Sequence, residues 1–340
     1  MKYGVFDHMD RWSQPLDLQY EMRLRLIEAY DRGGFYAYHL AEHHSTPLGM
    51  APAPGVFLAA VAQRTKRLRF GPLVYTLSIH HPLRAFEELC MLDHMSGGRL
   101  ELGIGRGISP IELGYYGIDP SQAQSIYLEA SAIILQAFSQ TTLNYQGKHF
   151  RFDNVPIEMT PFQRPRPPLW CGLGNPEGTV WAAQNKVNMV CNGPGRHIRT
   201  MTDRYKEEWT KAGGSLANLP FNGMSRHIVV ADTEAEAFKV ARPAYEKWYG
   251  SFIHLWNRNN AKPGNASYPS TFEDARREGL CIVGTAATVR DMISAQIAET
   301  GINYLLCRLA FGDLPYESSA RSVELLVSEV MPQVRRAEAA

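Results

Sequence analysis

The sequence contains little that would place the chain in a membrane, in an oxidising compartment or on nucleic acid. No run of about 18 apolar residues occurs, so no transmembrane helix is expected. The five cysteines are odd in number and none has C-x-x-C spacing, which favours reduced core residues over disulfides. The 35 basic and 34 acidic residues nearly cancel without forming a basic stripe, which argues against a nucleic-acid surface. These absences favour a cytoplasmic enzyme, and the first residues do not read as a signal peptide.

The chain does contain enough apolar sequence for one large core. It has 340 residues, of which 45% are hydrophobic. That fits one barrel-sized domain over residues 1–340 better than two small domains. No repeat or shift in composition marks a boundary.

Short apolar runs alternate with helical patterns along most of the chain. The runs predict eight strands, at residues 3–6, 35–40, 68–77, 99–104, 168–172, 187–191, 225–231 and 302–309. Helices are predicted at residues 17–32, 54–67, 82–94, 125–139, 176–184, 201–212, 233–248, 285–299 and 316–334. This order predicts an α/β fold, a (β/α)₈ TIM barrel whose site lies at the carboxyl ends of its strands.

Two segments fall outside the alternation. Residues 143–152 contain two short β runs around Gly147, which predicts a hairpin after the fourth helix. Residues 250–278 have no clear period and follow the seventh strand and its helix, so we expect a long lid-like loop there. Aromatic residues in and just before it would keep water from the barrel mouth: Trp248, Tyr249, Phe252, Trp256 and Tyr268.

Glu42-His43-His44 follows the second predicted strand. Neighbouring strand residues point to opposite faces, so His43 and His44 cannot easily bind one metal. No H-E-x-x-H motif is present, and no metal site is predicted. We expect His43 to enter the site as a general acid/base or hydrogen-bond donor, with a structural or capping role as the alternative.

A glycine-rich segment, Gly103-Ile104-Gly105-Arg106-Gly107, ends the fourth predicted strand. It is not a dinucleotide fingerprint, because Ile108 stands where G-x-G-x-x-G requires glycine. The alternating glycines would let a flat ligand or a phosphate approach the backbone, and Arg106 would offer a fork of donors to an anion. A solvated arginine on a loop is the alternative.

A second glycine-rich turn covers residues 172–179, after the fifth predicted strand. Asn175 is predicted to cap a helix whose first residue is Pro176, and the free N–H groups of such a helix start can bind an anion. Because strands four and five are neighbours in a barrel, this turn and Arg106 could hold the same phosphate. An ordinary capped helix is the alternative, and Glu177 favours it.

The order of these motifs resembles the bacterial luciferase-like, flavin-dependent monooxygenase family. The resemblance covers roughly the whole chain, and its most specific part is residues 80–107. The matching stretches are AEHH (41–44), RTKRLRFG (64–71), HHPLRAFEELCMLDHMSGGRLELGIGRG (80–107), YYGID (115–119), GLGNPEGTVWAA (172–183) and IVGT (282–285).

The resemblance implies a barrel that binds reduced FMN at its carboxyl rim. It implies that His43 lies near the flavin, and that Arg106 holds the flavin phosphate together with Asn175, Gly178 and Thr179. The helices after strands two and three would form a homodimer interface.

The same resemblance places the flavin ring against the end of the third strand. Backbone near Leu73 and Val74 would touch the ring, often through a cis peptide. From its position beside strand four, the segment Leu73–Leu77, which includes Thr76, could also line the pocket, with a buried strand as the alternative. Reduced FMN and O₂ would give a C4a-hydroperoxyflavin that transfers one oxygen atom to a small, apolar organic substrate. Reduced FMN would come from a separate NAD(P)H-dependent flavin reductase, because the sequence contains no nicotinamide fingerprint.

The sequence departs from the family at two glycines. Gly105 replaces the reactive cysteine of luciferase catalytic subunits, so light emission is not implied. Gly178 stands where a hydroxyl-bearing residue is common, which leaves phosphate contact to the backbone. A deazaflavin-dependent hydride transfer, a non-catalytic flavin-binding partner subunit and a metal-dependent hydrolase stay open as alternatives, although His43 and Arg106 together argue against the partner subunit.

Overall fold

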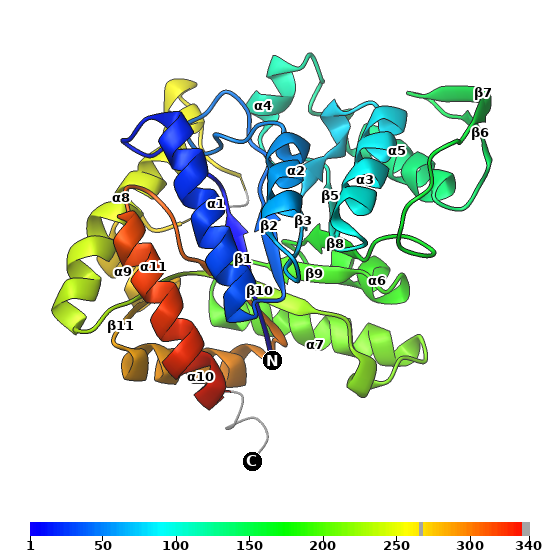
Figure 1. Cartoon of the computed structure of the whole chain (residues 1–340). Helices are drawn as coiled ribbons and strands as arrows, with labels where there is room; N and C mark the ends of the chain where they lie inside the picture. Colours follow the sequence, from blue (N-terminus) through cyan, green and yellow to red (C-terminus); the bar gives the residue numbers. More distant parts are fainter. Residues whose placement is uncertain (265–267, 335–340) are drawn as a thin grey trace.

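A parallel barrel surrounded by helices forms the body of the molecule (Figure 1). The computed structural model describes residues 1–264 and 268–334. The predicted (β/α)₈ barrel is confirmed, with β3 and β4 as two halves of its third strand. The barrel strands are β1 (Lys2–Asp7), β2 (Ala37–Leu40), β3 (Arg69–Pro72), β4 (Tyr75–Thr76), β5 (Leu102–Gly105), β8 (Leu169–Gly172), β9 (Asn188–Cys191), β10 (Asn222–Val230) and β12 (Tyr304–Arg308).

The strands follow the order β3-β2-β1-β12-β10-β9-β8-β5-β4. The ring closes between the third strand and β5, where Phe70 N donates to Arg99 O at 3.0 Å and Glu101 N donates to Phe70 O at 2.8 Å. All pairings along the barrel are parallel, so every strand ends at the same rim.

Amphipathic helices cover the outside of the barrel (Figure 1). Helix α1, for example, buries Leu26, Ile27 and Tyr30 on one side and ends at Gly34, whose φ of 74° suits glycine. The helices are α1 (Leu16–Gly33), α2 (Pro54–Arg64), α3 (Pro82–Ser96), α5 (Ala123–Ala137), α6 (Glu177–Gln184), α7 (Gly195–Lys211), α8 (Glu234–Arg258), α10 (Ala286–Thr300) and α11 (Tyr316–Leu325), which continues as a π-helical turn over Leu326–Val330.

The prediction of a lid-like loop over residues 250–278 is wrong for residues 250–258, which are helical. Helix α8 continues to Arg258, because Trp248, Ser251 and Leu255 recur at helical spacing and are buried against the barrel. A short helix, α9 (Phe272–Arg277), forms the end of the segment. Only residues 259–271 connect the two helices, and 265–267 of these lie outside the described residues.

Two further elements were not predicted. Strand β11 (Cys281–Gly284) pairs in parallel with the second half of β10, and α4 (Pro110–Tyr115) follows β5. The expected hairpin is confirmed as β6 (Thr142–Gln146) and β7 (Arg151–Pro156), which project from the barrel beyond α5 (Figure 1). Its turn is tied to α5 because Glu129 accepts hydrogen bonds from Lys148 N and His149 N, both at 2.9 Å.

The amino end of the barrel is filled by a buried carboxylate and aromatic rings. Glu101 accepts a hydrogen bond from Tyr36 OH at 2.8 Å, and it also contacts Trp170 Nε1 and the guanidinium of Arg69. The ring of Tyr304 packs against Trp170 with centroids 5.0 Å apart. Side chains therefore close this end, and a ligand site must lie at the carboxyl rim.

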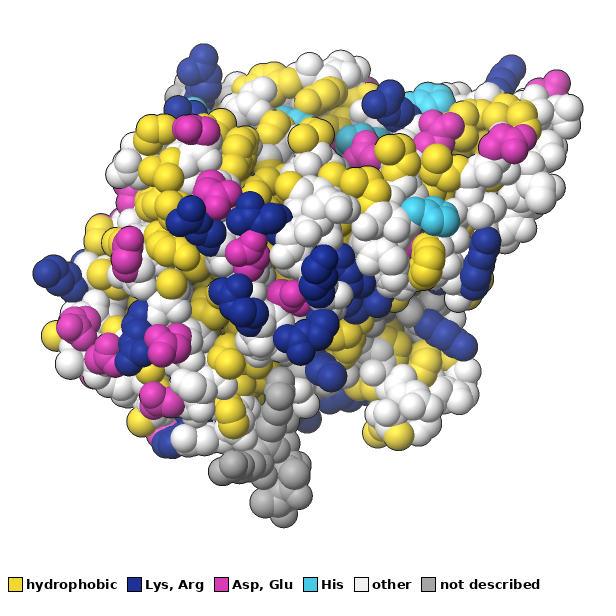
Figure 2. All heavy atoms as spheres, viewed as in Figure 1, with side chains coloured by type: hydrophobic (Ala, Val, Ile, Leu, Met, Phe, Trp, Pro, Cys, Tyr) yellow, Lys and Arg dark blue, Asp and Glu magenta, His cyan; other side chains and the backbone are white. Residues whose placement is uncertain are grey.

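The surface over α1 and α2 carries mixed charge (Figure 2). Arg64 pairs with Glu21 and Glu28, and Arg25 pairs with Glu21.

Within the described part of the chain, none of the helices has the length and hydropathy needed to span a bilayer. All five cysteines fall within that part, and each is buried and unpaired.

Candidate active site at the carboxyl rim

His43 lies at the carboxyl rim with its ring held by a carboxylate. Its Nδ1 is 3.2 Å from Glu112 Oε1, while His44 N donates to Glu112 Oε2 at 2.7 Å. A carboxylate accepts, so Nδ1 carries the proton and Nε2 is the nitrogen left for a bound molecule. Burial acts to raise the pKa of Glu112, but the charge and hydrogen bond of His43 hold it below its ordinary value.

Glu42 organises the polar side chains behind His43. Its Oε1 lies 2.9 Å from His44 Nε2 and 2.6 Å from His80 Nε2, and its Oε2 accepts from Thr76 N at 2.7 Å. Burial raises the pKa of Glu42, but hydrogen bonds from His44 and His80 outweigh it and lower the pKa. Within residues 1–264 and 268–334, no group of three or more His, Cys, Asp or Glu has the arrangement of a metal site.

A pocket opens beside His43 and Glu112. Helix α8, the part of the predicted lid that proved helical, supplies one wall, and the loop before α4 supplies another. Its apolar lining residues are Leu48, Ile108, Phe252, Leu255 and Trp256. Its polar lining residues are His43, Thr46, Ser109 and Glu112. Such a lining suits a small organic molecule next to a group able to donate or accept a proton.

The third strand is interrupted by a cis peptide bond between Leu73 and Val74. The glycines of β5 pack directly against this interruption: a Cβ on Gly103 would overlap Pro72 O, and one on Gly105 would overlap Val74 Cγ2. The expectation that these glycines make room for a ligand is therefore wrong at 103 and 105, because backbone and side chain of the third strand fill that space.

Thr76 and Gly107 continue the same contact. Gly107 has a φ of 89°, which favours glycine, and its Cβ position faces Thr76 Cγ2. Leu73 and Thr76 are buried and Val74 is partly exposed. The three residues expected to line the pocket thus lie together at the rim beside β5.

Arg106 follows β5, and the turn before α6 follows β8. Strands β5 and β8 pair through Leu102–Leu169 and Gly103–Trp170, as expected for neighbours. The Arg106 side chain is exposed and its Nε donates to Gly107 O at 3.3 Å; within residues 1–264 and 268–334 it has no carboxylate partner. The guanidinium is thus available to an external anion.

Helix α6 begins one residue later than predicted. Pro176 is the N-cap rather than the first helical residue, and Asn175 Oδ1 accepts from Gly178 N at 3.0 Å. Thr179 is buried, and its hydroxyl donates to Pro176 O at 2.6 Å. These donors are therefore internally bonded, and no hydrogen bond joins them to Arg106 in the described structure.

The residue types at Arg106 and at the start of α6 are nevertheless of the kind that can bind a phosphate: an exposed guanidinium and a glycine-rich helix start. A Cβ placed on Gly172 or Gly174 would meet nothing within 4 Å, so the turn before α6 leaves open space at these positions. Backbone N–H groups at the start of α6 add a favourable dipole. Around the rim, β8 pairs with β5 and β5 with β4, while β3, the other half of the third strand, pairs with β2, which precedes His43.

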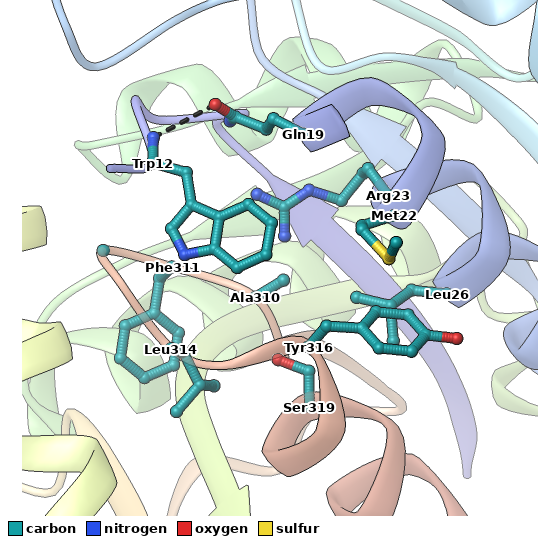
Figure 3. Close-up of a pocket in the computed structure, with 11 residues that line it drawn as sticks. Trp12, Gln19, Met22, Arg23, Leu26, Ala310, Phe311, Leu314, Tyr316 and Ser319 are labelled. Carbon is teal, nitrogen blue, oxygen red and sulfur yellow. Dashed lines mark hydrogen bonds between the residues drawn. The ribbon is translucent and has the colours of Figure 1, made fainter. Parts of the chain in front are cut away.

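Another cavity contains none of the predicted site residues (Figure 3). It lies between α1 and the segment from β12 to α11, where Trp12 N donates to Gln19 Oε1 at 3.0 Å. Arg23 on its wall is already paired with Asp7, Nε to Oδ2 at 3.0 Å. This cavity lies outside the barrel and does not adjoin His43.

Sequence reasoning missed Glu112, His8, His227 and Arg308 at the rim. Glu112 had a signal, because Ser109-Pro110-Ile111-Glu112 is a capping-box pattern and Ser109 Oγ accepts from Glu112 N at 3.2 Å. Arg308 interrupts an apolar strand, which was also visible. No sequence pattern marks His8 or His227 as a site residue. Their place at the rim depends on how β1 and β10 are arranged in the barrel.

The profile of the family described as luciferase-like monooxygenase matches residues 1–304 of the chain. An uncharacterized protein, y4wF, of Sinorhizobium fredii is 48% identical, with 98% of this chain and 97% of that protein covered. The oxygenase component of a flavin-dependent trigonelline monooxygenase from Acinetobacter baylyi is 27% identical, with 98% and 95% covered.

Solved structures show the same fold. The monooxygenase RslO1 from Streptomyces bottropensis superposes with a TM-score of 0.88 at 24% identity, covering 98% of this chain and 99% of that one. The oxygenating constituent of 3,6-diketocamphane monooxygenase from Pseudomonas putida, in complex with FMN, gives 0.82 at 21% identity, with 98% and 99% covered. A coenzyme F420 dependent tetrahydromethanopterin reductase from Methanopyrus kandleri gives 0.71 at 18%, with 98% and 99% covered. On the match of the family profile and the 48% identical relative, the chain belongs to the luciferase-like monooxygenases, a family of flavin-dependent enzymes.

Proposed function

We propose that this chain is the oxygenase component of a two-component monooxygenase that uses reduced FMN and O₂ to oxygenate a small organic molecule. The observation that carries the proposal is the rim itself. A histidine fixed by a carboxylate adjoins an apolar cavity, and an exposed guanidinium beside a helix start lies on the same rim.

The cofactor would be held at two places. Arg106 would bind the FMN phosphate together with the backbone and side chains of Asn175, Gly178 and Thr179, and Asn175 would release Gly178 N to do so. The flavin ring would lie against the third strand, described above. Bound FMN, reduced elsewhere, would supply the electrons that activate O₂.

His43 would handle the proton that oxygen transfer requires. Because Nδ1 is held by Glu112, the ring presents Nε2 toward a bound molecule and can donate or accept there. The carboxylate keeps one tautomer and one orientation, so the ring needs no reorganisation during turnover.

Aromatic side chains of α8 would exclude water from the reacting groups. Phe252 and Trp256 line the cavity, and Phe252 stacks on the buried Trp248 with ring centroids 5.6 Å apart. Excluding bulk water from this cavity would limit wasteful release of hydrogen peroxide.

Two partners follow from the proposal. A separate NAD(P)H-dependent flavin reductase would deliver reduced FMN, in line with the relative named as an oxygenase component. A second copy of the chain would pack on α2 and α3, which expose Val56 (77%), Met91 (52%) and Met95 (43%). The cytoplasm is the compartment that supplies both reductase and reduced thiols.

Oxygen consumption tests the proposal. The purified chain is supplied with FMN, NADH, a generic flavin reductase and candidate substrates under ¹⁸O₂. We expect substrate-dependent formation of a product carrying one ¹⁸O atom. A deazaflavin enzyme would instead bind and oxidise reduced deazaflavin without O₂ uptake, and a non-catalytic subunit would bind FMN without product.

A further inference from the structure

Arg308 is a buried cation for which the described part of the chain supplies no counter-ion. It is the last residue of β12 and is 3% exposed. Its Nη2 donates to Tyr268 OH at 3.0 Å and its Nη1 to His227 Nε2 at 3.5 Å, while Nε has no acceptor in the described residues. Nor does any Asp or Glu of that part of the chain form an ion pair with it. Burying an unpaired charge is expensive, so this guanidinium calls for an anion.

His227 adds a second donor without an acceptor. A guanidinium can only donate, so His227 Nε2 accepts from Arg308 and the ring proton lies on Nδ1. That Nδ1 has no partner among the described residues, and the side chain is 1% exposed. Burial, followed by the charge of Arg308, holds the pKa of His227 well below its ordinary value, so the ring stays neutral. Two touching side chains thus each keep a buried donor for which the described residues provide no acceptor.

These donors lie on the inner face of the barrel mouth. Tyr304 and Leu306 of β12 pack inside the barrel, and strand alternation puts Arg308 on the same face, one step nearer the rim. The sheet order places β12 between β1 and β10, on the other side of the barrel from β5 and β8. The Arg308 side is therefore opposite the corner formed by Arg106 and α6.

Aromatic rings surround the guanidinium and connect it to the cavity. Its central carbon lies 5.2 Å from the ring centroids of Phe6 and Trp248 and 5.4 Å from that of Tyr268. Phe252 packs against both Trp248 and Tyr268 and also lines the cavity beside His43. Phe252 therefore belongs both to the cluster of rings around the cation and to the lining of that cavity.

We propose that Arg308 and His227 form a carboxylate-binding subsite for the substrate. The oxygenated compound is then a small organic acid, with its carboxylate on Arg308 and its apolar body against the surrounding rings. This inference rests on the proposed function, since His43 and the cofactor would act on the end of the molecule remote from the carboxylate. It also refines the expectation of an apolar substrate by adding one anionic group.

A reduced flavin ring is a second anion that a guanidinium could bind. The proposed flavin residues belong to β4, β5 and α6, across the barrel from β12, which favours the substrate as the occupant. Both sources share a delocalised, planar negative charge, so the experiment has an arm for each.

Binding without turnover tests the subsite. Isothermal titration of the whole chain without cofactor compares three acids, benzoate, nicotinate and hexanoate, with their amides. We expect the acids to bind more tightly by at least about tenfold, as hydrogen bonds to a charged group predict. Arg308→Met should bring the ratio close to one, whereas Arg151→Met, at an exposed arginine of the outlying hairpin strand β7, should keep it.

Each alternative outcome overturns the inference. Equal binding of acids and amides by the unaltered chain, or an undiminished preference in Arg308→Met, contradicts a carboxylate subsite. If Arg308→Met does not fold, Arg308→Lys decides: it keeps the charge but loses the planar fork, so the preference must fall several-fold. An unchanged preference in that variant also contradicts the proposal.

The flavin arm is an anaerobic titration with reduced FMN. Arg308→Met should bind reduced FMN as the unaltered chain does. A selective loss of reduced-FMN affinity, with the acid preference intact, would assign the guanidinium to the flavin. Because the acid and amide titrations need no oxygen chemistry, a failure of the proposed monooxygenase activity would not mimic a failure of the subsite.

Discussion

His43 and Glu112 form the contact on which the proposed chemistry most depends. We expect His43→Ala to lower formation of oxygenated product by about 10²–10⁴-fold, because the proton-handling group is lost. Glu112→Gln should lower product formation by a smaller factor, since the His43 ring remains but its orientation is no longer fixed by a carboxylate charge. Product yield per NADH consumed is the measurement, with hydrogen peroxide counted separately.

His149→Ala is the matched control for this pair. His149 lies in the turn of the outlying hairpin and contacts Ser125 Oγ at 2.8 Å, so its loss should leave product yield unchanged. FMN affinity should also survive in His43→Ala. If that variant turns over substrate normally, the acid/base role of His43 is wrong.

Asp10 makes stability depend on pH. Burial raises the pKa of this carboxyl to about 7, against the opposing effects of Arg23 and the N–H of Gly312. The unfolded chain, with a pKa near 3.8, releases the proton first as pH rises. The stabilising contribution is therefore complete below the unfolded pKa and is lost as pH rises through about 7.

Asp10→Asn removes this titration. Relative to the original chain, the variant should gain about 1–3 kcal/mol of unfolding free energy between pH 5 and pH 8. Urea unfolding at the two pH values measures the difference. A constant difference between variant and original chain would show that Asp10 does not titrate in this range.

Single residues show how far a sequence can predict a site. His43 and Arg106 follow strands and carry chemistry, so both were predictable from their positions. The pairing of His43 with Glu112 was not, because it joins the end of β2 to a helix 69 residues later. The unpaired state of Arg308 depends on which carboxylates are absent around it, and only a three-dimensional arrangement shows that.

At the scale of elements, β5 packs closely against the third strand. We expect Gly103→Ala to destabilise the fold by about 1–3 kcal/mol, because its Cβ would meet Pro72 O and lie 3.0 Å from Leu73 Cα. Gly172→Ala, at the end of β8, has open space at the same position and should be near neutral. Equal urea midpoints for both variants would contradict this account.

The β6–β7 hairpin depends on one carboxylate. Three backbone N–H groups of its turn, those of Lys148, His149 and Phe150, donate to Glu129 of α5. Glu129→Ala should raise amide exchange at residues 148–150 at least about tenfold, while amides in β1 and β12 stay protected. Unchanged exchange at the turn would mean that strand pairing alone holds the hairpin.

Element boundaries were predictable where local signals were strong. Pro82 starts α3 and Gly97, with a φ of 64°, ends it, close to the predicted range. The prediction failed at residues 250–258 because their polar and aromatic composition suggested a loop. In the structure, burial of Leu255 keeps them helical. The break at Leu73–Val74 left no local trace, since the whole stretch 68–77 reads as one strand.

At the scale of the whole molecule, α2 and α3 expose the apolar side chains proposed to join two copies. Val56→Arg should convert a dimer into a monomer, because a buried charge would face its own copy across the symmetric contact. Sedimentation velocity measures the change. Leu216→Arg, an equally apolar and exposed site beyond α7, is the control and should leave the assembly intact.

The overall architecture was the most predictable level. Eight apolar runs separated by helical patterns admit few closed arrangements, and parallel pairing brings all their ends to one rim. Because all strand ends meet at one rim, the sequence was enough to predict that a site would lie there. It was not enough to predict which molecule each part of the rim binds, because that depends on charges contributed by distant strands.

The burial of every cysteine has a consequence for an enzyme that would handle activated oxygen. Burial raises the pKa of Cys90, Cys171 and Cys191 to about 12, so almost no thiolate exists at neutral pH. Thiolate is the form of cysteine that reacts with oxidants, and the cysteines of the folded chain should therefore resist oxidation by peroxide leaking out of its own reaction. A thiol-labelling disulfide reagent should find no fast-reacting sulfhydryl in the native protein and all five after denaturation.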